Sequence, residues 1–133
     1  ANLILSAFAD KAHKRDISME IKAQIPTMPA VSESDLCVLL SNALENALHA
    51  CMNVQAKGLP AAIDVMAYQQ KDTFFIQIKN SCEENVEFVN EIPVTRRAGH
   101  GIGVRSICAV VERYGGLYSF SAANGQFILR VSL

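Results

Sequence analysis

The chain has 133 residues, half of them apolar, and a formal net charge of −1 at pH 7. This length suits one domain with its own core, and the balanced charge argues against nucleic acid as the main ligand. No apolar run approaches the roughly 18 to 20 residues of a membrane span. The apolar start of the chain lacks the basic leader of a signal peptide. We therefore expect a soluble globular domain.

The four cysteines are scattered along the chain and form no Cys-x-x-Cys pair. Their spacing favours neither a zinc site nor a disulfide framework. Their aliphatic neighbours are typical of small core residues in a reducing compartment, so the cytosol is the default location.

The apolar pattern predicts a helix at residues 2–14 and a strand at residues 17–25. In the strand every second residue is apolar, which is typical of a half-buried strand. The helix has no clear cap at its start, so we expect it to continue from an upstream segment. Ser32 or Ser34 is suited to cap a long helix that runs to about residue 54. The apolar side of this long helix carries Leu36, Leu40, Ala43, Ala47 and Val54.

The rest of the chain predicts two hairpins with a helix between them. The elements are strands at 63–68 and 74–80 around a turn at 69–72, a loop at 81–100, a helix at 103–114 ended by Gly115-Gly116, and strands at 117–122 and 127–133 around Asn124-Gly125. The order implies an α+β fold, a two-layer α/β sandwich. Its sheet is mixed and mostly antiparallel, with about three helices on one face.

Gly99, Gly101 and Gly103 alternate directly before an amphipathic helix. Glycine lets the backbone approach a ligand closely, and a helix N-terminus attracts anions. The element order is not a run of βαβ units, and the Lys-Ser/Thr of a P-loop is missing, so neither a Rossmann site nor a P-loop is indicated. Taken alone, the glycines fit any loop that enters a helix.

Asn42 and Asn46 lie one helical turn apart, on an arc that also carries Glu45, His49 and Asn53. Asparagine is a mediocre helix former, so two on one face need an explanation. A solvated face explains the pair alone equally well. The functional alternative is that amide oxygens ligate Mg²⁺, which keeps most of its waters and bridges to phosphates.

Asn80 ends an apolar strand, where its amide could hydrogen-bond a planar heterocycle; alone, it also fits a simple turn residue. Basic groups before the glycine helix could reach phosphates across the loop, and a solvated charge run is the alternative. This second set is Thr95, Arg96, Arg97 and His100.

Three motifs together resemble the GHKL ATP-binding (Bergerat) fold of gyrase, Hsp90, histidine kinase and MutL proteins. They are Asn42-Ala-Leu-Glu-Asn46-Ala as the N-box, Ile78-Lys-Asn80-Ser as the start of the G1 box, and His100-Gly-Ile-Gly-Val-Arg-Ser as the G2 box. The likeness runs from about residue 17 to the end. It is greatest to the ATP-binding domain of sensor histidine kinases of the peptide-quorum-sensing and citrate-sensor-like type. We expect residues 1–14 to end an upstream dimerisation hairpin and 15–133 to form the catalytic domain.

The resemblance implies ATP and Mg²⁺ as cofactors. It implies that Asn46 ligates Mg²⁺, that Asn42 and His49 lie beside the phosphates, and that Asn80 faces the adenine amino group. It makes Asn42 and Asn46 the catalytic pair and residues 82–100 the ATP lid. The remaining implied nucleotide contacts are Arg97, Gly99, His100, Gly101, Ile102, Gly103, Val104 and Arg105.

The chain departs from the family pattern at two places. The G1 box usually reads Asp-x-Gly-x-Gly, where this chain has Asn80, Cys82 and Glu84. The Asn80 amide oxygen can still accept a hydrogen bond from the adenine N6–H, but unlike the usual aspartate it carries no charge. Hydrolytic members carry a water-activating glutamate where this chain has Asn42. This favours phosphoryl transfer to a histidine. Glu45 is near enough that a hydrolytic function stays an open alternative.

The resemblance thus implies the ATP-binding catalytic domain of a two-component sensor histidine kinase. The γ-phosphoryl group of Mg-ATP would pass to a histidine on a separate, upstream dimerisation domain. A response regulator, a homodimeric full-length protein and a cytoplasmic position below a membrane-anchored sensor follow from the same resemblance. His13 lacks the acidic neighbour expected of an acceptor, so we expect ATP binding with little autokinase activity. Two alternatives stay open: an anti-sigma-like regulatory kinase that binds a partner, and a nucleotide-hydrolysing switch.

Overall fold

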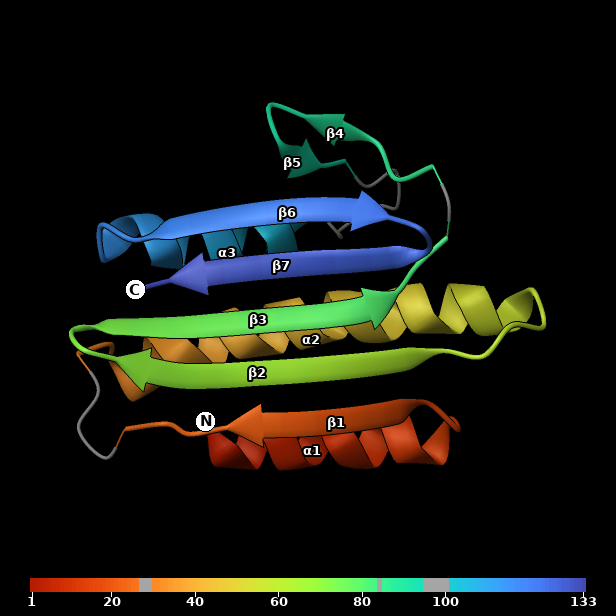
Figure 1. Ribbon diagram of the computed structural model, residues 1–133, viewed down its shortest axis with the longest axis horizontal. Coiled ribbons are helices and arrows are strands. Elements are labelled where there is room, and N and C mark those ends of the chain that lie inside the picture. The colour runs from red at the N-terminus through yellow and green to blue at the C-terminus, as the bar shows by residue number, and fades with distance from the viewer. Residues whose placement is uncertain (27–29, 84, 95–100) are drawn as a thin grey trace.

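One sheet carries the helices of the described residues on a single face (Figure 1). The computed structural model describes residues 1–26, 30–83, 85–94 and 101–133. The helices are α1 (Asn2–Lys14), α2 (Glu33–Ala56) and α3 (Gly101–Arg113). The strands are β1 (Ser18–Ala23), β2 (Ala62–Gln70), β3 (Thr73–Ser81), β4 (Phe88–Val89), β5 (Ile92–Pro93), β6 (Leu117–Ala123) and β7 (Gln126–Ser132).

The main sheet has the strand order β1-β2-β3-β7-β6. β1 and β2 run parallel and are joined through α2, whereas the other neighbouring strands of this sheet run antiparallel. A parallel pair needs such a crossover connection, and α2 supplies it. The predicted α+β sandwich with a mixed, mostly antiparallel sheet is therefore confirmed.

Of the two serines predicted as caps of the long helix α2, Ser32 is the cap. The Ser32 hydroxyl oxygen accepts a hydrogen bond from the Asp35 backbone N–H at 3.1 Å, which satisfies one of the unpaired donors of the first turn. The apolar side predicted from the sequence is buried. Its buried residues are Leu36, Leu39, Leu40, Ala43, Leu44, Ala47, Leu48, Cys51 and Val54.

The end of α3 and both predicted hairpins are also confirmed. The backbone N–H groups of Gly115 and Gly116 donate to the carbonyls of Glu112 and Val111, each at 3.0 Å, which is the Schellman pattern. Gly115 has a φ of 65°, a conformation that glycine adopts without strain. The start of α3 at Gly101 lies two residues before the predicted one.

Residues 81–100 contain regular structure that the sequence did not predict. Phe88 pairs with Pro93 and Val89 with Ile92, which makes β4 and β5 a small separate hairpin. The Phe88 ring stacks on Phe127 of β7, with 6.4 Å between ring centroids. Strands of two residues have no periodicity to detect, and this pair depends on a contact with a distant part of the chain.

The first strand differs from its prediction in length and burial. β1 spans six residues rather than nine, and Ile21, expected on a half-buried face, is 36% exposed. The strand lies at an edge of the sheet and has one neighbour, so its side chains are covered less fully than those of β2 and β3.

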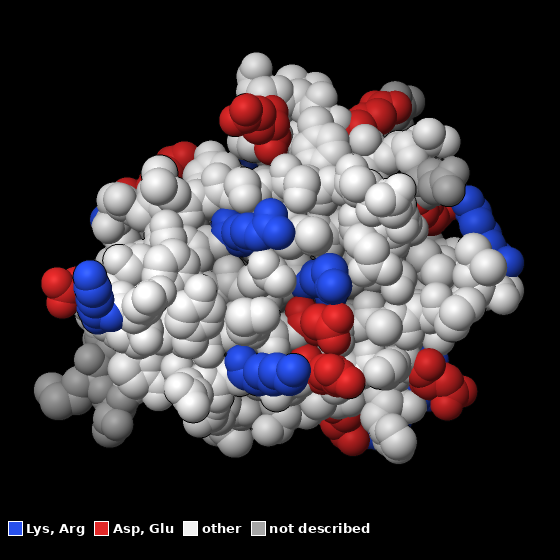
Figure 2. Space-filling view, in the orientation of Figure 1, with Lys and Arg blue, Asp and Glu red and all other residues white. Residues whose placement is uncertain are grey.

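α1 shares the core of the domain through its buried Leu5, Phe8 and Ala12. The division of the chain at residue 14 stays a prediction. Figure 2 shows the open face of the sheet, where acidic and basic side chains are interspersed. Within the described residues, no helix combines the length and apolarity needed to cross a bilayer.

A polar clamp joins the start of α2 to the end of α3. Asp35 accepts hydrogen bonds from the Tyr114 hydroxyl at 2.5 Å and from Arg113 Nη1 at 2.6 Å. The Tyr114 oxygen in turn accepts from the Ser32 backbone N–H at 3.1 Å. The Tyr114 hydrogen bond, more than the nearby Arg113 charge, holds the pKa of Asp35 below its ordinary value of 3.8.

The clamp predicts an acid-dependent loss of stability. Because the Asp35 pKa is lower in the folded than in the unfolded chain, its contribution is present above pH 3.8 and is lost as the pH falls through the folded-state pKa. Tyr114→Phe should lower the Tm at pH 7 by a few degrees. On acidification its Tm should fall by less than that of the wild type, because the variant lacks the hydrogen bond that lowers the Asp35 pKa. Thermal unfolding followed at several pH values from 7 down to about 2.5 measures both the Tm at pH 7 and its fall in acid. Tyr68→Phe, on the open sheet face, is the control; equal acid sensitivity in wild type and Tyr114→Phe would contradict the clamp.

Candidate functional site

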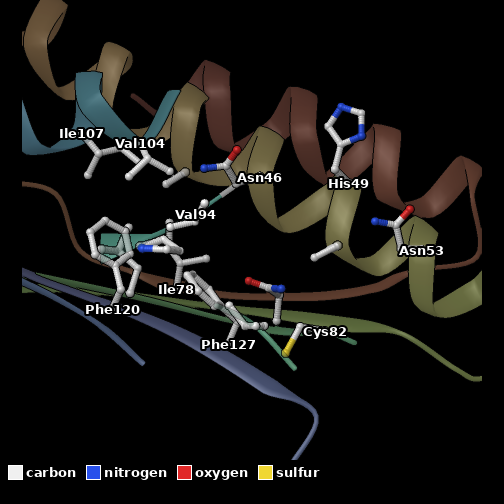
Figure 3. Close-up of a pocket in the computed structure, with 16 residues that line it drawn as sticks. Asn46, His49, Asn53, Ile78, Cys82, Val94, Val104, Ile107, Phe120 and Phe127 are labelled. Carbon is white, nitrogen blue, oxygen red and sulfur yellow. The ribbon is translucent and has the colours of Figure 1, made fainter. Parts of the chain in front are cut away.

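A cavity of about 200 Å³ opens between α2 and the sheet (Figure 3). It draws its walls from α2, α3, three strands of the main sheet and the segment that follows β3. The lining residues are Ala43, Asn46, His49, Ala50, Asn53, Ile78, Asn80, Cys82, Val86, Pro93, Val94, Val104, Ile107, Phe120, Phe127 and Leu129.

The sheet side of the cavity is apolar and partly aromatic. Phe120 and Phe127 lie on adjacent strands with ring centroids 6.1 Å apart, and Figure 3 shows both rings on this side. Ile78 and Leu129 are buried beneath. Flat, apolar walls with a few polar groups are typical of sites for planar ligands.

The two asparagines of α2 lie against the first turn of α3. A Cβ atom at Gly103 would be 3.3 Å from Asn42 Oδ1 and 3.7 Å from Asn46 Oδ1. Asn42 Nδ2 donates to the Val38 carbonyl at 2.8 Å, which fixes how its amide is turned. Glycine thus lets α3 begin close to two amide oxygens, and the first turn of a helix has unpaired N–H groups. Three of the predicted site residues are brought together here.

His49 lines the cavity, but its ring is turned away from the two phenylalanines in Figure 3. Its Nε2 lies 3.6 Å from Glu45 Oε1, one helical turn earlier. This places an ionisable pair on the outer side of α2 next to Asn46. Both residues belong to the polar arc that the sequence predicted.

Asn80 is 3% exposed, which the sequence did not predict for a strand-end asparagine. Its Nδ2 donates to the Ser81 carbonyl at 2.9 Å. Cys82 lines the same cavity, and burial raises the pKa of its thiol. The Asn80 side chain is therefore a hydrogen-bonding group at an apolar cavity, as the heterocycle hypothesis requires.

The predicted G2 residues divide into three groups. Arg97, Gly99 and His100 lie outside the described residues. Gly101 begins α3 and Val104 lines the cavity, whereas Ile102 is 66% exposed and Arg105 is exposed.

The sequence alone missed the lining residues Val86, Val94, Phe120 and Phe127. Val86 and Val94 lie in the predicted lid segment between two of the motifs, whereas Phe120 and Phe127 lie on the last hairpin. The apolar character of all four is the same as that of core residues. The alternation of Phe120 with Ser119 and Ser121, on the strand before the Asn124-Gly125 turn, was a signal that Phe120 faces one side of a hairpin.

Comparisons with known proteins identify a family and a shared fold. The family model of the GHKL domain matches residues 31–133. A search of curated proteins finds no match. The nucleotide-free catalytic domain of the histidine kinase ThkA superposes with a TM-score of 0.76 at 15% identity, over 99% of this chain and 87% of that one.

Two further solved structures have the same fold. The mycobacterial sensor histidine kinase MprB gives a TM-score of 0.73 at 18% identity, over 99% of this chain and 92% of that one. The histidine kinase domain of the blue-light activated kinase EL346 from Erythrobacter litoralis gives a TM-score of 0.73 at 15% identity, over 96% of this chain and 56% of that one. Identities this low show a shared fold. The chain belongs to the GHKL domain family and has the fold of histidine kinase catalytic domains.

Proposed function

We propose that this chain is the ATP-binding catalytic domain of a sensor histidine kinase. One observation carries the proposal: the first turn of α3, at Gly103, lies against the amide oxygens of Asn42 and Asn46, beside the apolar cavity that Asn80 lines. Groups suited to phosphate, a hard cation and a planar base thus meet at one place.

The cavity fits the base rather than the whole nucleotide. Its volume of about 200 Å³ is below the roughly 300 Å³ at which sites for drug-sized ligands begin. Adenine would lie between α2 and the phenylalanines, with Asn80 at its polar edge. The phosphates would extend toward the first turn of α3, where unpaired backbone N–H groups favour anions.

The amide oxygens suit Mg²⁺. Within the described residues no three His, Cys, Asp or Glu side chains gather in a way that could hold a metal. In this proposal Asn46 supplies one hard oxygen ligand, and waters and phosphate oxygens supply the rest. When bound, Mg²⁺ neutralises phosphate charge and helps to orient the transferred group.

The residues around the cavity favour transfer over hydrolysis. Among the described lining residues there is no aspartate or glutamate. Asn42 has no basic carboxylate, and Glu45 is half exposed and paired with His49. The acceptor would be a histidine on an upstream dimerisation domain, within a homodimeric, membrane-anchored sensor that serves a response regulator.

Titration with ATP, with and without Mg²⁺, tests the cation assignment. We expect Mg²⁺ to tighten ATP binding. In Asn46→Ala this gain in affinity should be about tenfold smaller, while the affinity for ATP without Mg²⁺ should be unchanged. Isothermal calorimetry measures each affinity, and Ser34→Ala, on the exposed first turn of α2, is the control. Absence of ATP binding in the wild type, or equal Mg²⁺ gains in all variants, would refute the assignment.

Gly103→Ala separates folding from binding. Alanine favours a helix over glycine by about 1 kcal/mol, which should offset the close contact with Asn42 Oδ1 and leave the Tm little changed. The added methyl group should push the first turn of α3 from the amides and weaken ATP binding several-fold. Ala109→Ser, exposed on the same helix, is the control. Unchanged affinity in Gly103→Ala would place the phosphates elsewhere.

Asn42→Glu tests the reaction type. An amide cannot take a proton from water, whereas a carboxylate at this place could. We expect ATP hydrolysis by the wild type to stay near background and not to exceed that of Asn42→Glu, measured as phosphate release. Brisk hydrolysis by the wild type would favour the ATPase alternative.

A further inference from the structure

Asn80 and Ser81 are the buried polar side chains of the described residues, thiols apart, at 3% and 9% exposure. They are neighbours at the end of β3. Alternation along a strand places Asn80 on the cavity side and Ser81 on the other side, and only Asn80 lines the cavity. Ser81 would therefore act on a ligand only through Asn80.

The Ser81 hydroxyl continues the sheet where the backbone pairing stops. β2 and β3 pair as far as Ile63 and Asn80, so the next step would set Ala62 opposite Ser81. There, Ser81 Oγ accepts from the Ala62 N–H at 3.0 Å and donates to the Ala62 carbonyl at 3.5 Å. The side chain thus holds the Ser81 peptide in place as β3 leaves β2.

A thiol from α2 approaches the same point. Cys51 Sγ lies 3.6 Å from the Ala62 carbonyl oxygen and 3.9 Å from the Ser81 carbonyl oxygen. Burial raises the pKa of Cys51 to about 11, so at neutral pH it is a thiol that can donate. The helix and both strands therefore hold the Ser81 carbonyl in a fixed position.

The fixed carbonyl determines how the Asn80 amide is turned. Asn80 Nδ2 donates to it at 2.9 Å. Turning the amide over would bring Oδ1 against the same carbonyl oxygen, and two acceptors at hydrogen-bond distance repel each other. Only one orientation is therefore favourable.

We propose that Ser81 is a positioning residue that holds the Asn80 amide with its oxygen available to the cavity. The site then selects a purine that carries an exocyclic amino group at its edge over one that carries a carbonyl or only hydrogen there. This inference rests on the proposed nucleotide site and adds to it the residue that determines base selectivity.

Three nucleotides that differ at one position of the base test the inference. They are ATP, purine riboside triphosphate, which lacks the amino group, and inosine triphosphate, which has a carbonyl. For the wild type we expect about tenfold tighter binding of ATP than of purine riboside triphosphate, and the weakest binding for inosine triphosphate. Ser81→Ala should reduce this ratio toward one and leave the affinity for purine riboside triphosphate unchanged, which a merely structural defect would not do.

Two variants and one control complete the set. Ser81→Thr keeps the hydroxyl and should keep the ratio. Asn80→Leu, similar in size but without the acceptor, should bind ATP and purine riboside triphosphate equally. Ser119→Ala, exposed on β6, should behave as the wild type.

The outcomes separate this inference from the proposed function. Failure of the wild type to bind any of the three nucleotides overturns both. Binding of all three with equal affinity, or full discrimination by Ser81→Ala, overturns the role of Ser81 and leaves the nucleotide site standing. If Ser81→Ala does not fold, amide exchange in the wild type decides: slow exchange of the Asn80 side-chain NH₂ supports the inference and fast exchange overturns it.

Discussion

The burial of α2 against the sheet is the interaction on which the site depends. Nine of its 24 residues are buried, along one side of the helix. This fixes the rotation of the helix about its axis, and a helix that cannot rotate holds its polar edge in one direction. Asn42 and Asn46 are on that edge. The clamp of Asp35 with Arg113 and Tyr114 then ties α3 to the start of α2. The contact at Gly103 follows from these two constraints.

The cavity combines apolar walls with few polar groups, each held by a separate contact. Asn42 is tied to the Val38 carbonyl within its own helix, whereas Asn80 is tied to the Ser81 carbonyl at the end of β3. Because both amides are oriented before a ligand arrives, binding does not have to order them. Such preorganisation suits a site that must position a transferred group rather than supply a base or nucleophile.

The β4–β5 hairpin forms part of the wall through a long-range contact. Phe88 stacks on Phe127, and Pro93 of β5 lines the cavity with the adjacent Val94. The turn residues Asn90 and Glu91 have φ values of 53° and 65°, a conformation that a non-glycine residue adopts at some cost. The aromatic stacking is a favourable contact of the same hairpin. A two-residue strand held in this way leaves no pattern in the local sequence.

Features that depend on neighbouring residues could be predicted from the sequence. A serine at 32 or 34 as the cap of α2, Gly115 and Gly116 at the end of α3, and Asn124-Gly125 as the turn of the last hairpin are such features, because caps and turns are satisfied within a few residues. Which functional groups meet in the site could be seen only from the packing of the whole domain. The burial of Asn80, the close approach of Gly103 to the amides of Asn42 and Asn46, and the placement of Phe120 and Phe127 at the cavity all depend on segments distant in sequence. Such contacts are set by how whole elements pack, which no local pattern records.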